Sequence, residues 1–377
     1  MAQQNNNIRI GITQGDINGV GLEIIVKTLS NHDILELFTP VIFGSAELLR
    51  KTAEALHVDD FHFEVVKTAE EIADGRINVI ETCETTPLQT PGIPSEEGGK
   101  AAVASLKAAT AAIEDGTIDL LVTAPIDKKT AKSEGFDFTG HTEYLEDRFV
   151  VEGGKALMIL AYDDMRVALV TTHLPLSEVA KSITKEKIEE SIRNFNRALK
   201  MDFGCERPKI AVLSLNPHCG DGGVLGDEEL SVILPAVEQC KREGIMAFGP
   251  IAADGLFGSG ACHSFDGILA MYHDQGLAPF KALAGARGVN YTAGLNIIRT
   301  SPDHGTAYDK AGHGIADETS MREAIYAAID IAKRRDIYLD ASENPLKITE
   351  RPQKEHRKKQ EQTTEAEEAK TPENGRD

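Results

Sequence analysis

Residues 301–318 read SPDHGTAYDKAGHGIADE, a stretch that fits neither a strand nor a helix. It has little β-branched content, a proline at position 302, and three glycines, two of which directly follow a histidine. This composition predicts a long structured loop, and loops of this length inside a compact domain tend to carry function. The rest of the chain must then supply the scaffold that holds the loop.

The chain before this loop alternates short apolar runs with helical patterns, which predicts βαβ units and mostly parallel sheet covered on both faces. Helical periodicity is clearest at residues 101–116 and 184–200. The runs at 156–162 and 166–172 are separated by turn residues and predict an antiparallel hairpin, so we expect a mixed sheet. The predicted strands are 8–13, 41–44, 77–81, 119–124, 156–162, 166–172, 209–215 and 267–272.

Composition narrows the class of protein. A length of 377 residues suits two domains. The net charge of −20 argues against a nucleic-acid partner, so an anionic substrate needs a local cluster of cations or backbone amides. No apolar run approaches the ~20 residues that span a bilayer, and the N-terminus does not resemble a secretory signal. The five scattered cysteines indicate reduced thiols in a cytoplasmic protein.

The C-terminal residues 341–377 differ from the rest. They are polar and charged, and the last aromatic residue of the chain is Tyr338. Such a segment buries too little surface to order itself, so we expect a disordered tail. The alternative is a segment that folds on a partner.

Three predicted strands each deliver a histidine within three residues of their C-terminal end: His173, His218 and His273. Ligands bind outside the carboxyl ends of strands in open α/β sheets, and three imidazoles with open positions are typical of a catalytic metal site. Zinc or another borderline divalent ion suits such a set. Asp221 and Asp274 are candidates for orienting the rings, or for further ligands. The alternative is three unrelated, hydrogen-bonded histidines.

Other polar residues suggest an anion site. His141 and Thr142 precede a plausible helix, with Thr142 as a candidate cap, and amides at a helix start bind anions. Lys281, Asn290 and Arg299 recur at intervals of nine in a glycine-rich segment and could bind carboxylate and phosphate. Each of them alone is more typical of a solvated surface.

Familiar nucleotide-binding motifs are missing from the sequence. TQGDINGVGLEI at 13–24 is a glycine-rich turn between a strand and a helix, but its spacing differs from the Rossmann fingerprint. The backbone of this turn either approaches a ligand or only forms a tight connection between the strand and the helix. GGK at 98–100 lacks the other residues of a P-loop.

The loop at 301–318 resembles the adenosine-binding loop of the isocitrate/isopropylmalate dehydrogenase fold, which binds NAD(P) without a Rossmann fingerprint. Together with GHTEYL, TTHLPL, NPHCGDGG, GPIAADGLF and MYHDQGLAPFK, it resembles the 4-hydroxythreonine-4-phosphate dehydrogenase family of vitamin B6 synthesis. The likeness runs from about residue 8 to about residue 335. GDINGVGLE departs from the proline-containing form of that turn, which weakens any role assigned to it.

The resemblance implies two α/β/α domains with mixed, mostly parallel sheets and an interdomain cleft. A cofactor-side domain would comprise 8–135 plus 300–340, and a metal, substrate and dimerisation domain would comprise 136–299. It also implies a cytoplasmic homodimer whose active site is shared across the interface.

The implied reaction is the NAD(P)-dependent and metal-dependent oxidation of 4-phosphooxy-L-threonine, followed by decarboxylation to 3-amino-2-oxopropyl phosphate. Zinc is the favoured metal, with magnesium and cobalt as alternatives. Rival interpretations are a sister dehydrogenase of phosphorylated threonate, erythronate or a cis-dihydrodiol dicarboxylate, and a metal-dependent hydrolase. The resemblance implies that the metal is bound by His173, His218 and His273, one of them from the partner subunit, and that the substrate is bound by His141, Thr142, Lys281, Asn290 and Arg299. Asp274 and Lys281 are the candidates for proton transfer. The candidate cofactor contacts are His304, Gly305 and Asp309, with Lys310 as a candidate contact for the NADP phosphate.

Overall fold

The computed structural model describes residues 8–132, 136–138, 140–151 and 154–345. The chain divides into a compact unit, Met1–Leu339, and a C-terminal unit, Asp340–Asp377. The last helix, α11 (Thr319–Glu343), extends into the segment predicted to be disordered. Positions 346–377 of that predicted tail lie outside the described residues.

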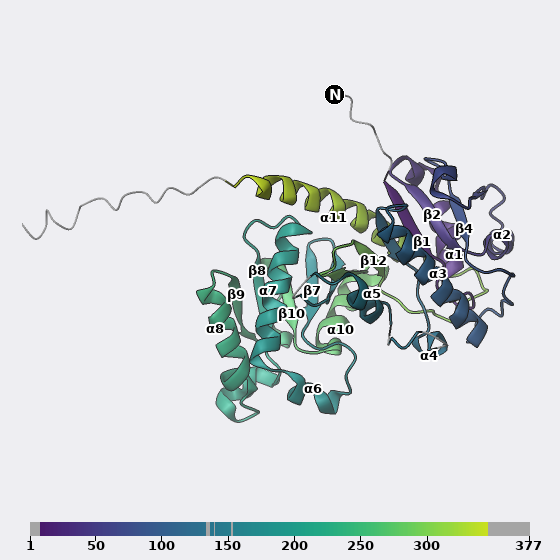
Figure 1. The fold of residues 1–377 in the computed structure, drawn as a ribbon. Helices are drawn as coiled ribbons and strands as arrows, with labels where there is room; N and C mark the ends of the chain where they lie inside the picture. Colours follow the sequence, from purple (N-terminus) through teal and green to yellow (C-terminus); the bar gives the residue numbers. More distant parts are fainter. Residues whose placement is uncertain (1–7, 133–135, 139, 152–153, 346–377) are drawn as a thin grey trace, which may run out of the picture. The chain divides into compact units, whose positions relative to one another are not determined.

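The described strands form a 12-stranded sheet in the order β3-β4-β2-β1-β5-β12-β11-β6-β7-β10-β8-β9 (Figure 1). Three neighbouring pairs are antiparallel, β12/β11, β11/β6 and β6/β7, and the other pairs are parallel. The predicted mixed, mostly parallel α/β fold is therefore confirmed, including the 156–162/166–172 hairpin. The strands are β1 (Arg9–Thr13), β2 (Thr39–Gly44), β3 (Glu64–Val65), β4 (Asn78–Glu81), β5 (Leu120–Thr123), β6 (Leu157–Tyr162), β7 (Met165–Leu169), β8 (Lys209–Leu213), β9 (Met246–Ile251), β10 (Gly267–Ala270), β11 (Val289–Ala293) and β12 (Arg299–Pro302).

All eight predicted strands form, and the sequence analysis missed β3, β9, β11 and β12. Strand β12 has the sequence RTSP, which is polar, although all four residues are buried. An apolar pattern cannot reveal such a strand, because its polar groups are paired by tertiary contacts. One of these contacts is Arg299 Nη1, which donates to Thr292 Oγ1 of β11 at 3.1 Å.

The helices form two layers on the sheet. In β6, Ile159 belongs to the same apolar cluster as Phe195 of α7, whereas Leu160 joins the cluster that contains Phe280 of α10. Because successive side chains of a strand point to opposite faces, α7 and α10 cover opposite faces. The predicted helices at 101–116 and 184–200 are confirmed as α3 and α7. The α-helices are α1 (Gly21–Leu29), α2 (Ala46–Ala55), α3 (Glu96–Glu114), α4 (Lys128–Ala131), α5 (His141–Phe149), α6 (Leu176–Ser182), α7 (Lys185–Met201), α8 (Leu234–Arg242), α9 (Ala253–Gly258), α10 (His273–Ala284) and α11.

Short 3₁₀ helices and one π-helix, η4, complete the described elements. They are η1 (His32–Glu36), η2 (Ala69–Glu71), η3 (Pro217–Gly223), η4 (Glu229–Ile233), η5 (Ala261–Ser264) and η6 (Gly285–Arg287). Within the described ranges, none of the helices combines the length and apolar content that crossing a bilayer requires.

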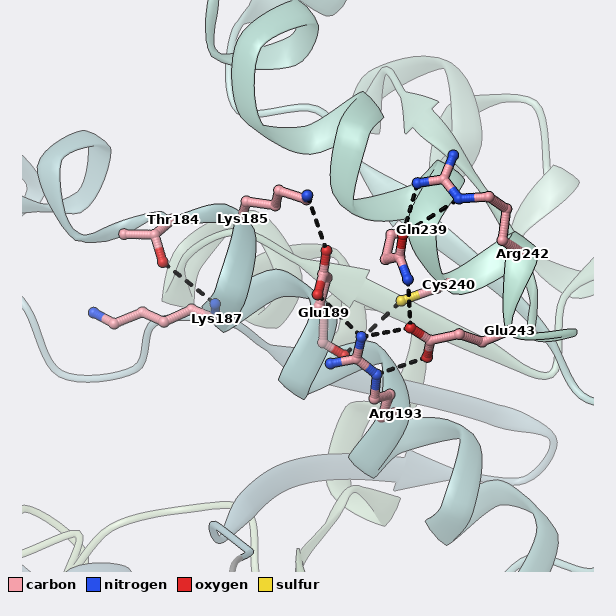
Figure 2. Close-up of polar contacts among 9 residues, drawn as sticks. All are labelled: Thr184, Lys185, Lys187, Glu189, Arg193, Gln239, Cys240, Arg242 and Glu243. Atoms are coloured by element: carbon pink, nitrogen blue, oxygen red, sulfur yellow. Dashed lines mark hydrogen bonds and ion pairs between the residues drawn. The ribbon is translucent and has the colours of Figure 1, made fainter.

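An ion pair fastens α7 to α8 (Figure 2). Arg193 donates from Nε and Nη2 to the two carboxylate oxygens of Glu243, at 2.7 Å each. Glu189 accepts a further bond from Arg193 Nη2 at 3.0 Å. The bonds from Arg193, followed by that from Gln239, lower the pKa of Glu243 to about 2. The fork geometry of this pair fixes the relative orientation of the two helices.

Candidate active site

A cavity of about 250 Å³ lies at the carboxyl ends of several strands. Most of the predicted site residues line it, although they come from segments far apart in the sequence. Five predicted residues are not in its lining: His218, Asp221, Asp274, Asp309 and Lys310. Those in its lining are His141, Thr142, His173, His273, Lys281, Asn290, Arg299, His304 and Gly305.

Arg299 places a buried positive charge in this cavity. Its side chain is 2% exposed, and its Nη2 and Nε donate to Thr123 Oγ1 at 2.6 and 3.1 Å. In the part of the chain that the structure describes, no carboxylate forms an ion pair with it. Burial lowers the pKa of Arg299 to about 10. A buried cation whose only partners are hydroxyl groups is well suited to an anionic ligand.

His141 is the first residue of α5, and Gly140 occupies the cap position without a side-chain cap bond. The prediction that Thr142 caps this helix is therefore wrong: Thr142 lies inside the first turn, where its side chain cannot take the cap position. The His141 Nε2 atom is buried without a protein partner. Burial, then Arg299 and Lys128, hold the pKa of His141 well below its ordinary value of 6.5. A neutral imidazole with one unpaired nitrogen is thus available to a ligand.

His173 and His273 face each other across the cavity, with ring centroids 5.9 Å apart. Asp274 Oδ1 lies 2.8 Å from Nδ1 of His273, and Glu143 Oε1 lies 4.0 Å from Nδ1 of His173. A proton on each Nδ1 leaves the lone pair of each ring on Nε2, which is the tautomer that carboxylates select in metal-binding histidines. Two such imidazoles fit part of a divalent metal site. His273 and Asp274 are the first two residues of α10, because the backbone turns into a helix at His273.

His218 lies elsewhere. It lines a second cavity together with Tyr272 and Gln275. The preceding strand β8 neighbours β10 in the sheet, but His218 begins a left-handed turn with φ values of 53° at His218 and 46° at Asp221. His218 is not among the residues that line the first cavity. Accordingly, the described residues contain no cluster of three or more His, Cys, Asp or Glu side chains able to hold a metal within one chain.

The turn that carries His218 is held at its base by a buried carboxylate. Glu229 is 1% exposed, and its Oε1 accepts the backbone N–H groups of Leu215 and Asn216 at 2.8 and 2.7 Å. Its Oε2 accepts a bond from the Asn216 side chain at 3.0 Å. These bonds define where the left-handed turn begins.

Lys281, on α10, donates to the carbonyl of Asp303 at 2.6 Å, so it joins the helix to the start of the 303–318 segment. Asn290 Oδ1 is buried without a protein partner. His304 Nδ1 donates to the Gly305 carbonyl at 2.9 Å, and its buried Nε2 has no protein partner. Burial raises the pKa of Asp303. Unpaired buried polar atoms are costly, and several of them in one cavity favour the binding of a polar ligand there.

The long loop predicted at 301–318 is confirmed for residues 303–318, which form turns without a strand or helix, whereas Ser301 and Pro302 belong to strand β12. It packs on the N-terminal glycine-rich turn, where Val20 N–H donates to the Thr306 carbonyl at 2.9 Å. Tyr308 donates to Asp16 at 2.8 Å. The glycine-rich turn at 13–24 therefore supports the loop at 303–318 and is more than a tight turn.

Helix α1 anchors the far end of the same loop. Lys27 donates to the carbonyls of Gly314 and Ala316 at 2.7 and 2.6 Å, and Gly312 N–H donates to Glu23 at 2.5 Å. These bonds hold the loop backbone in one conformation before any ligand binds.

The sequence analysis missed three ionisable residues that line the cavity: Lys128, Glu143 and Asp303. Lys128 follows β5 in the segment APIDK and begins α4. Lys128 lies four residues after the predicted strand at 119–124, one position beyond the three-residue window that selected the histidines. Glu143 gave no such signal, because its closeness to His173 depends on how α5 packs.

Comparisons with known proteins show the family of the chain. Residues 36–328 match the family model described as pyridoxal phosphate biosynthetic protein PdxA. The chain is 54% identical over 344 residues to 4-hydroxythreonine-4-phosphate dehydrogenase of Bacteroides thetaiotaomicron, covering 91% of this chain and 94% of that protein. It is 40% identical over 327 residues to an Oceanobacillus iheyensis protein provisionally named D-threonate 4-phosphate dehydrogenase, covering 86% and 97%.

Solved structures give the same result. The crystal structure of 4-hydroxythreonine-4-phosphate dehydrogenase from Klebsiella pneumoniae superposes with a TM-score of 0.74 at 34% identity, covering 88% of this chain and 99% of that one. A terephthalate 1,2-cis-dihydrodiol dehydrogenase from Burkholderia xenovorans, at 24% identity and a TM-score of 0.55, shares the fold.

Proposed function

The chain belongs to the pyridoxal phosphate biosynthetic protein PdxA family, and we propose that it oxidises 4-hydroxythreonine 4-phosphate (4-phosphooxy-L-threonine) with a nicotinamide cofactor. The reaction moves hydride from C3 of the substrate to the nicotinamide and releases the hydroxyl proton. The product, 2-amino-3-oxo-4-phosphooxybutanoate, is a β-keto acid and loses CO2 to give 3-amino-2-oxopropyl phosphate. The observation that carries the proposal is 54% identity over 91% of the chain, joined to a cavity built for an anion.

The substrate is doubly anionic, with a phosphate and a carboxylate. Arg299 supplies a buried charge whose protein partners are hydroxyl groups, and Lys281 supplies a second cation on the same cavity. His141, Thr142 and Asn290 supply neutral hydrogen-bonding groups. This local cluster overcomes a net charge of −20, because short charge-assisted bonds in a partly dry cavity outweigh the screened field of distant charges.

Metal binding would use His173 and His273 with His218 of the partner subunit, which fits the separation of His218 from the other two within one chain. When bound, a divalent ion supplies the charge that lowers the pKa of the substrate hydroxyl. Imidazole ligands favour zinc, with magnesium and cobalt as alternatives. Asp274 orients His273, and Asp274 and Lys281 are the candidate acceptors of the hydroxyl proton.

Because one metal ligand comes from a partner subunit, the proposed enzyme is a homodimer, and we place it in the cytoplasm. The cavity takes residues from both proposed domains, 8–135 plus 300–340 and 136–299, which supports a cleft between them. The loop at 303–318 then holds the adenosine end of NAD or NADP, with His304, Gly305 and Asp309 as contacts and Lys310 as a cation for a ribose phosphate.

The test is NAD(P) reduction by purified protein with 4-phosphooxy-L-threonine. An absence of NAD(P) reduction refutes the proposal. The likeness to the O. iheyensis protein, 40% over 86% of this chain, makes D-threonate 4-phosphate the second candidate, and the higher kcat/KM decides between the two. A chelator is expected to abolish turnover and to weaken the dimer, as measured by sedimentation. A metal-dependent hydrolase would instead leave NADH fluorescence unchanged on titration.

A further inference from the structure

Lys128 is an exposed residue that lines the cavity, and its contact with His173 is the feature that the proposed function does not use. Its Nζ lies 3.0 Å from Nε2 of His173. An ammonium group only donates hydrogen bonds, so Nε2 must be the acceptor and the ring proton must lie on Nδ1. The lone pair that a metal would take is therefore occupied by a protein cation.

The backbone around Lys128 is fixed, whereas its side chain is long enough to move. Lys128 begins α4, and Asp127 Oδ1 caps this helix by accepting the N–H groups of Lys129 and Thr130 at 2.8 and 2.9 Å. The Thr130 hydroxyl also donates to the buried Asp16 at 3.3 Å. Movement of the ammonium therefore requires only side-chain rotation.

The lysine stem passes over the start of α5. A Cβ placed on Gly140 would lie 3.4 Å from Cε of Lys128. Gly140 directly precedes His141 and Thr142, which line the same cavity. An ammonium that leaves His173 while its stem stays here remains within reach of a ligand bound to those two residues.

We propose that Lys128 holds the place of the metal on His173 and that metal binding displaces its ammonium toward the substrate, where it becomes a further contact for an anionic group. The inference rests on the metal site of the proposed function. The two cations compete for one lone pair and repel each other at close range, so they cannot occupy it together. Metal binding thus makes the Lys128 ammonium available to the anionic groups of the substrate.

The experiment compares Lys128→Met with Lys129→Met in the full chain. Lys129 is the next residue of α4, is exposed and does not line the cavity, so its variant makes the same charge change as a matched control. Zn2+ is titrated calorimetrically into metal-free protein, and KM for 4-phosphooxy-L-threonine is measured on the metal-loaded protein. Melting curves verify folding, and Lys128→Arg, which retains the charge, provides a second variant.

We expect Lys128→Met to bind Zn2+ about tenfold more tightly than wild type, because the competing charged hydrogen bond is gone, and to raise KM about tenfold. Lys129→Met changes neither quantity, and Lys128→Arg keeps an affinity for Zn2+ close to wild type. Unchanged or weaker Zn2+ binding by Lys128→Met overturns the inference, and an unchanged KM overturns the substrate contact. If wild type and Lys129→Met both bind no Zn2+, the metal site itself fails and this inference fails with it.

Discussion

Replacing Arg299 by methionine tests whether the buried charge is reserved for the substrate. Methionine keeps a long, unbranched side chain at the position and removes only the charge and its donors. The Arg299 pKa falls from 12.5 to about 10 on burial, a drop of about 2.5 pKa units that corresponds to about 3 kcal/mol. This is the order of magnitude of the free energy that holding the guanidinium without an anionic partner costs the protein.

Binding of an anion recovers that free energy, so its loss weakens binding by a similar amount. At 1.4 kcal/mol for each factor of ten, Arg299→Met is expected to raise KM for 4-phosphooxy-L-threonine about a hundredfold. The variant should also lose the rise in melting temperature that substrate produces in wild type, because ligand stabilises only through binding to the folded state. Arg299→Lys keeps the charge but not the planar fork, so we expect an intermediate KM.

The matched control is Arg76→Met. The Arg76 side chain is 69% exposed and pairs with Glu64, and neither residue lines the cavity. The control should keep the KM and the substrate-induced melting shift of wild type. If Arg299→Met behaves like this control in both measurements, Arg299 does not bind the substrate and the argument from its burial is wrong.

Three further perturbations test other parts of the structure. Because the pKa of His141 is low in the folded protein, the unfolded chain binds the proton first as pH falls below 6.5, and the folded state loses stability as pH falls. His141→Gln should therefore reduce the fall of the urea unfolding midpoint between neutral and acidic pH. Tyr291→Phe removes the bond of 2.7 Å to buried Asp202 and should lower the free energy of unfolding by about 1–3 kcal/mol, with KM unchanged; a large rise in KM would contradict a purely structural role. Gly19→Ala would place a Cβ 2.8 Å from the Thr306 carbonyl and should raise KM for the nicotinamide several-fold, while the substrate-induced melting shift persists; equal effects on both ligands would contradict a local effect on the loop.

Much of the fold could be predicted because it depends on local apolar patterns. The eight predicted strands are runs of apolar residues, and burial of those residues drives their pairing. Strand β12 escaped prediction because Arg299, Thr300 and Ser301 are polar, and their burial depends on partners contributed by distant segments, such as Thr123 of β5.

The site was partly predictable for a topological reason. Parallel strands end at the same edge of a sheet, so polar residues that follow them gather there. Strands β7, β10 and β8 are consecutive neighbours in the sheet, and two of their three histidines, His173 and His273, do line one cavity. The prediction that His218 completes the set now depends on a partner subunit.

The sequence by itself determined eight of the twelve described strands of the sheet, most of the irregular loop, and which residue types the strand ends carry. These are consequences of composition and short-range periodicity. Only the tertiary structure decided that His218 lies in a left-handed turn outside the first cavity, that Lys128 lies 3.0 Å from His173, and that Arg299 is buried with hydroxyl partners. Those outcomes depend on long-range packing and on the direction of side chains, which no local pattern of residues encodes.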